Sequence, residues 1–129
     1  MSATQRLDLR CDMERTSAIT IAAAPSGGLT CSQVYYSNNL MGIIVTDVDE
    51  DEKVAMLYEI PSPGILMPCD EVGTGDFGLG SPVYAISGET KVYCTEVSSS
   101  YLVGYVVEAP ALAAEAVLVH WMGDIHNYV

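Results

Sequence analysis

Gly73, Gly75 and Gly78 have the spacing of a dinucleotide-binding loop, in which glycines let a pyrophosphate approach the backbone. Such a loop works only between a strand and a helix, because the helix N-terminus holds the phosphate charge. Here Pro68 precedes the glycines, and a β-type run that begins at Pro82 follows them. The segment is therefore interpreted as a flexible loop and not as a nucleotide site.

The acidic segment 47–52 resembles part of a calcium loop, because hard cations prefer several carboxylate ligands. Counted from Asp47, however, the position that needs glycine is Glu52, and the position that needs a bidentate glutamate is Tyr58. A solvated acidic turn is favoured over a specific metal site. Weak cation binding stays open, because carboxylates this dense repel one another.

His120 and His126 are the only histidines, and neither has a Glu, Cys or His at metal-ligand spacing. His120 is expected to be half-buried on a strand and His126 to be exposed in the tail. A nucleophile drawn from Cys94 or residues 98–100, activated by His120, has no supporting local motif. The sequence predicts no enzyme, no cofactor and no metal. A small hydrolase is the least favoured reading.

The four cysteines contain no Cys-x-x-Cys pair, so neither a zinc nor a redox motif is present. Free and mostly buried thiols are expected, because a domain of this length does not need disulfides; two disulfides stay an alternative. The cysteines are Cys11, Cys31, Cys69 and Cys94.

The chain carries 17 acidic and 5 basic residues, a net charge of −12. Such a body repels nucleic acid and anionic membranes, so neither is a predicted partner. The most apolar run, 101–122, contains acidic residues and a proline and is not a predicted membrane span. The short apolar run 18–24 lacks the preceding positive charge of a signal peptide, which favours synthesis and assembly in the cytoplasm.

Short β-type runs separated by Gly, Pro, Ser and Asn predict an all-β protein, a compact barrel or sandwich of eight to nine strands. A further apolar run, 64–68, is too short for a helix, and 109–114 is a candidate helical turn. The predicted organisation is an N-terminal arm at 1–16, a barrel at 17–123 and a tail at 124–129. The strands are expected at 17–23, 31–36, 40–46, 53–60, 82–86, 91–96, 101–107 and 115–122.

An ordered series of short segments resembles a family of small phage proteins, long described as a domain of unknown function, that includes capsid decoration (cement) proteins. The chain departs from it at Ser81-Pro82, where the family usually has an aspartate, and residues 1–16 have no counterpart. The segments that carry the resemblance are 25–28, 41–47, 54–56, 64–68, 80–84, 88–93, 103–107 and 116–119.

The resemblance implies a β-barrel, often trimeric, on the capsid exterior near local three-fold positions, without catalytic residues or cofactor. The predicted partners are the major capsid protein and further copies of the chain, and the predicted location is the outer surface of the virion. A protein that binds only the assembled shell would stabilise the shell. A virion-surface adhesin or glycan-binding module is the alternative function.

Candidate contact residues fall in two groups. The first lies in residues 1–16, which are predicted to be an arm that docks on the capsid or a neighbouring subunit. Residues 1–15 are neutral overall and hold three of the five cations; a disordered terminus is the alternative. The second is a set of aromatic residues on apolar strand faces, for which a buried core position is the alternative. The candidates are Arg6, Arg10, Arg15, Tyr35, Tyr36, Tyr101 and Trp121.

Overall fold

The computed structural model describes residues 9–11, 13–21, 23–69, 78–108 and 116–123. This part of the chain is all-β, with eight strands and one short 3₁₀ turn, which confirms the predicted class and strand number. The elements are η1 (Met13–Arg15), β1 (Ser17–Ile21), β2 (Val34–Ser37), β3 (Leu40–Ile44), β4 (Val54–Pro68), β5 (Pro82–Ile86), β6 (Val92–Tyr93), β7 (Ser100–Glu108) and β8 (Ala116–Met122).

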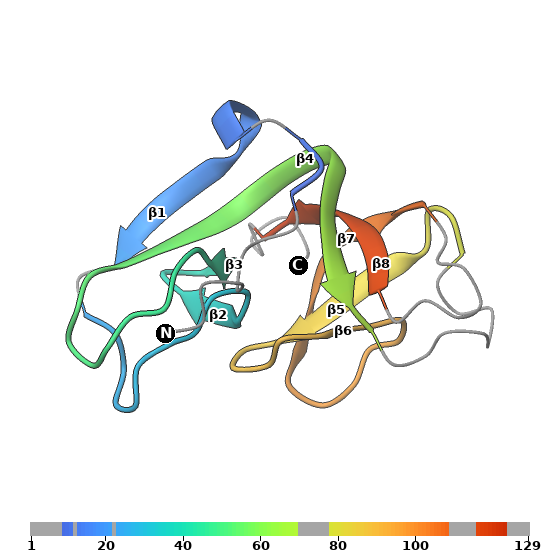
Figure 1. The fold of residues 1–129 in the computed structure, drawn as a ribbon. Helices are drawn as coiled ribbons and strands as arrows, with labels where there is room; N and C mark the ends of the chain where they lie inside the picture. The colour runs from blue at the N-terminus through green and yellow to red at the C-terminus, as the bar shows by residue number, and fades with distance from the viewer. Residues whose placement is uncertain (1–8, 12, 22, 70–77, 109–115, 124–129) are drawn as a thin grey trace.

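All named strand pairs are antiparallel, and the sheet order is β2-β3-β4-β8-β7-β5-β6, with β1 paired to β4 beside this path. The sheet curls into a half-barrel (Figure 1). Two backbone bonds link its ends. Val34 N–H donates to the Glu89 carbonyl over 2.7 Å, and Gly88 N–H donates to the Val34 carbonyl over 2.7 Å. The β5–β6 turn therefore lies against β2.

Strand β4 is the longest element and bends in its middle. The sequence predicted a strand at 53–60 that ends at the prolines, and a separate short run at 64–68. The structure joins them into one strand, whose register with β8 shifts between Ile60 and Ile65. Pro61 and Pro63 fall inside this irregular stretch, where no ladder N–H is needed. At Gly64 φ is +91°, and an added Cβ would lie 2.0 Å from the Val119 carbonyl oxygen, so only glycine fits.

The core consists of two apolar clusters. In the smaller cluster, the buried side chains come from β3, β4 and the loop after β1; they are Ala24, Leu29, Ile44, Val54 and Met56. The larger cluster fills the half-barrel and includes alternate residues of β8, namely Val117, Val119 and Trp121. Among the described residues no polar or charged side chain is buried. Burial of apolar surface therefore supplies most of the stability.

Trp121 ties β8 to β3 at the centre of the larger cluster. Its side chain is fully buried, and its indole N–H donates to the Met41 carbonyl over 2.9 Å. Met41 N–H in turn donates to the Gly123 carbonyl over 2.7 Å. The indole thus fills the core and also satisfies a backbone acceptor that water cannot reach.

This contact predicts that Trp121→Phe lowers the free energy of unfolding by about 1–3 kcal/mol, because it opens a small cavity and leaves the buried Met41 carbonyl without the indole donor. Tyr101→Phe is the matched control, because it removes a hydroxyl from a side chain that is 38% exposed. Chemical denaturation followed by circular dichroism measures both variants, because Trp121→Phe removes the only tryptophan and its fluorescence. Equal stability of Trp121→Phe and the wild type would contradict this role.

Candidate functional site

Part of the predicted arm lies on the barrel. Leu9 forms an antiparallel bridge with Ile65, and its side chain packs against the larger cluster. Arg10 N–H donates to the Gly64 carbonyl over 2.8 Å. The exposed Arg15 ends η1, directly before β1. The structure therefore places Arg10 beside the bend of β4 and Arg15 at the end of η1, whereas Arg6 lies outside the described residues.

The structure brings Tyr36 and Tyr101 together. Their rings stack with centroids 5.4 Å apart and an interplanar angle of 7°, and the stack joins β2 to β7. Tyr36 is held further by its N–H, which donates to Ser87 Oγ over 3.0 Å, and by its hydroxyl, which donates to Asn39 Oδ1 over 2.9 Å. These contacts make an aromatic surface patch where the β5–β6 turn lies against β2.

The other two aromatic candidates lie elsewhere. Tyr35 packs against the smaller cluster, on the opposite face of β2 from Tyr36. Trp121 is fully buried and occupies the core position that was the alternative for each residue of this set. Its size did not distinguish the two readings, because large aromatic residues are common both in cores and at interfaces.

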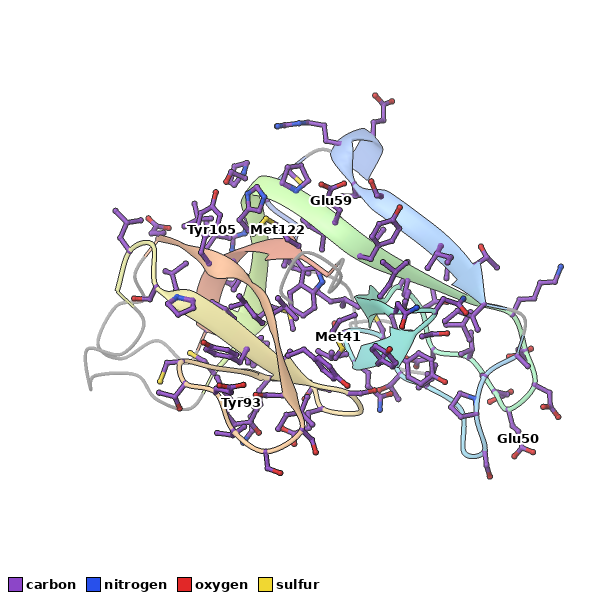
Figure 2. All side chains as sticks on the ribbon, turned by 180° about the vertical axis from the view of Figure 1, so that it is seen from behind. Met41, Glu50, Glu59, Tyr93, Tyr105 and Met122 are labelled. Atoms are coloured by element: carbon purple, nitrogen blue, oxygen red, sulfur yellow. The ribbon has the colours of Figure 1, made fainter. Side chains whose placement is uncertain are left out.

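Polar and aromatic side chains surround His120, where β4, β7 and β8 meet. The imidazole stacks on Tyr105 with ring centroids 4.9 Å apart and planes 13° apart. Its Nδ1 accepts the Ser62 backbone N–H over 3.0 Å and lies 2.9 Å from Ser62 Oγ. Figure 2 shows Tyr105, Met122 and Glu59 on this side of the molecule. Sequence reasoning missed Ser62, since only the bend of β4 carries it to a histidine 58 residues away.

The hydrogen bond from Ser62 N–H fixes the tautomer of His120. A backbone N–H can only donate, so Nδ1 carries the lone pair and the ring proton of the neutral form is on Nε2. Burial lowers the pKa of His120 from its ordinary value of 6.5, and the charge of Glu59 opposes this by raising it. The half-buried strand position expected for His120 is confirmed.

Ser100, one of the candidate nucleophiles, is held in a turn. Ser100 Oγ donates to the Val97 carbonyl over 2.7 Å and accepts the Val97 N–H over 3.0 Å. The hydrogen bonds of His120 go to Ser62 and Tyr105. None of the four cysteines forms a disulfide; Cys31 and Cys69 are buried, and Cys11 and Cys94 are half-buried. The described residues show no pairing of His120 with Cys94 or Ser100.

Carboxylates of the acidic segment bind backbone amides. Asp47 Oδ1 accepts the Cys31 N–H over 2.7 Å, and Glu52 Oε1 accepts the Asp49 N–H over 2.8 Å. Within the described ranges, no group of three or more His, Cys, Asp or Glu side chains could hold a metal ion. Likewise, no helix in this part of the chain is long and apolar enough to cross a membrane. Most of the glycine-rich segment 73–78 lies outside the described residues.

The described surface thus offers aromatic and polar patches on the half-barrel. A comparison with protein families decides which kind of protein this is: residues 13–121 match the phage cement protein family. The chain belongs to the phage cement protein family. Among curated proteins and among solved structures, none matches it.

Family membership assigns the chain a structural role in the virion, where it stabilises the capsid. The match begins at Met13 and ends at Trp121, so it takes in η1 and nearly all of the eight strands. The cement domain therefore includes the last residues of the segment that the sequence assigned to an arm. Residues 1–12 precede the match.

The geometry at His120 predicts a pH dependence of stability. Its pKa is lower in the folded protein than in the unfolded chain, so the unfolded chain binds more protons in this range. Stability should therefore decrease as the pH falls through the ordinary value of 6.5 towards the lowered value. His120→Asn keeps an acceptor for Ser62 N–H but does not titrate.

Thermal denaturation between about pH 8 and pH 5 tests this dependence, because a histidine changes charge in that range. The melting temperature of the wild type should fall more steeply than that of His120→Asn, while His126 is the same in both proteins. Parallel curves for the two proteins would show that protonation of His120 does not affect folding.

Proposed function

We propose that the chain binds the exterior of the assembled phage capsid through the major capsid protein and stabilises the shell as a trimer at three-fold or quasi-three-fold positions. The observation that carries the proposal is the family match, which spans nearly all of the barrel. A protein that binds only the assembled shell raises the free energy needed to dismantle it. The role needs no catalysis and no cofactor.

The charge distribution supports an orientation with one end in solvent. Five carboxylates and one cation, Lys53, lie in the segment 47–53. Glu50, within this turn, lies far from Tyr105 and the bend of β4 (Figure 2). Those carboxylates of the turn that face solvent would keep particles apart in solution. The net charge of −12 argues against a nucleic-acid or membrane partner for the same protein.

Exposed apolar side chains near β7 support self-association. Tyr101 is 38% exposed, Tyr105 is 37% exposed and Leu79 is 76% exposed. Leu79 belongs to this surface because the next residue, Gly80, donates its N–H to the Val106 carbonyl over 2.9 Å. A trimer that buries such side chains would gain apolar contact without bringing the acidic turns together.

The proposed function predicts that purified protein binds phage particles that lack it and raises the temperature at which they release DNA. At a free concentration one hundred times Kd, each occupied site should stabilise the assembled state by about 2.7 kcal/mol. Co-sedimentation measures binding, and dye accessibility of the DNA measures release. An equally acidic unrelated protein is the control. Binding to a glycan array, without binding to particles, would instead favour the adhesin alternative.

The predicted arm can be tested apart from the barrel. Deleting residues 2–8 removes Arg6 but keeps Leu9 and Arg10, which contact β4. We expect the deletion to lower capsid occupancy and to leave the melting temperature unchanged. Arg15→Gln tests the exposed cation of η1 in the same assay. Full occupancy by both variants would show that residues 2–8 and the cation of Arg15 do not contribute to attachment.

A further inference from the structure

Strand β1 has a free edge within the described part of the chain. It pairs with β4 alone, from Ser17 opposite Glu59 to Ile21 opposite Val54. The other side of the same stretch of β4 is taken by β3, with Ile43 opposite Leu57. In Figure 1, β1 is the outermost strand on this side of the molecule. Its second edge therefore faces outward.

The register shows which backbone groups lie on that edge. Val45 N–H donates to the Ala55 carbonyl over 3.1 Å, so the polar groups of Ala55 point towards β3. Thr20 stands opposite Ala55 in the ladder between β1 and β4. Facing residues in an antiparallel ladder point their backbone N–H and carbonyl either towards each other or both away from each other. Since those of Ala55 point away from β1, those of Thr20 point away from β4, towards the outer edge of the sheet. Ala18, two residues earlier, presents the same side.

This edge lacks the usual protection against strand addition. Ser17–Ile21 contains no charge and no proline, two of the devices by which natural proteins block an open edge, and the register shift of its ladder lies at its first residue. The sheet's other terminal strands are engaged: β2 through Val34 and the β5–β6 turn, and β6 through the bridge from Val92 to Cys69. An unblocked, β-prone edge is suited to recognising an extended segment by main-chain hydrogen bonds.

The charges around β1 indicate what kind of segment fits. At one end, Ser17 Oγ donates to Glu59 Oε1 over 3.0 Å, and this carboxylate is exposed. At the other end, Ala24 exchanges backbone hydrogen bonds with Asp51 and Glu52 of the acidic turn. Arg15 and Lys53 also flank β1, but the carboxylates of Glu59 and of the segment 47–52 outnumber them. A second copy of β1 would therefore bring mainly like charges to this edge, where they repel. A segment carrying Lys or Arg would be attracted.

The side chains of β1 set the pattern of the incoming strand. Ile19 and Ile21 are half-buried against the smaller cluster, whereas Ala18 and Thr20 are exposed on the other face. A strand added beside β1 would continue both faces. Apolar residues of the added strand would cover the remaining exposed surface of Ile19 and Ile21. The alternate residues of the added strand would lie beside Thr20.

We propose that the open edge of β1 adds an extended segment of the capsid protein, with alternating apolar and basic residues, as a further strand of the sheet. The inference rests on the proposed function, because it takes the capsid protein as the partner. It specifies the kind of contact: main-chain hydrogen bonds to Ala18 and Thr20, with charge attraction at both ends of β1.

The test measures the binding of four variants to phage particles that lack the protein. Thr20→Pro removes the outward N–H, and Thr20→Lys places a cation beside the basic segment; each should weaken binding about tenfold or more. Thr20→Glu should bind more tightly than Thr20→Lys, and the difference should shrink at high salt. Thr95→Lys adds the same charge at an exposed residue of the β6–β7 loop and is the matched control. Circular dichroism verifies folding, and the two charge variants decide the matter if Thr20→Pro misfolds.

Hydrogen–deuterium exchange of the wild type gives a direct readout. The amides of Ala18 and Thr20 should become protected on the particle, because strand addition bonds them. Wild-type binding without this protection, or equal binding by all variants, would overturn the inference and leave the proposed function intact. Wild type that fails to bind particles would overturn both. Self-association that Thr20→Pro abolishes would identify a second copy as the added strand and contradict a capsid segment.

Discussion

The constraint on which this structure depends is that one strand, β4, serves both parts of the sheet. Its first half pairs with β1 and β3, and its second half pairs with the beginning of β8. To do so it must bend between Ile60 and Ile65, and the bend interrupts the ladder there. Side chains and neighbouring segments then satisfy the freed backbone groups: His120 accepts the Ser62 N–H, and Arg10 N–H binds the Gly64 carbonyl.

This construction explains why the proposed contact surfaces lie where they do. The bend of β4 is where the N-terminal segment reaches the barrel, through Leu9 and Arg10. Because the first half of β4 diverges from the half-barrel, it can carry β1 as an outer strand with an open edge (Figure 1). Binding to a large assembly needs such placed edges and patches more than it needs a pocket, and a rigid scaffold holds them at low entropic cost.

Local signals were sufficient to predict the class, most strands and the turns. The segments 82–86 and 91–96 were predicted as strands from the sequence, and they contain β5 and β6, which pair with each other. The continuity of β4 could not be predicted, because prolines such as Pro61 and Pro63 normally end a strand. Only the pairing of β4 with β8 on both sides of these prolines shows that they lie in a bend of one strand. Burial of Trp121 and the contact between Ser62 and His120 depend on which strands become neighbours, and the sequence alone does not specify that. The pairing of Tyr36 with Tyr101 was missed for the same reason.

The central claim is that this barrel acts as a bound structural element on the outside of the assembled shell. Cryo-electron microscopy of particles with and without the protein tests it most directly. The account predicts external density that fits the barrel, in groups of three at local three-fold positions, with β1 next to the shell. Density on the interior, or an unchanged exterior in particles that contain the protein, would contradict it.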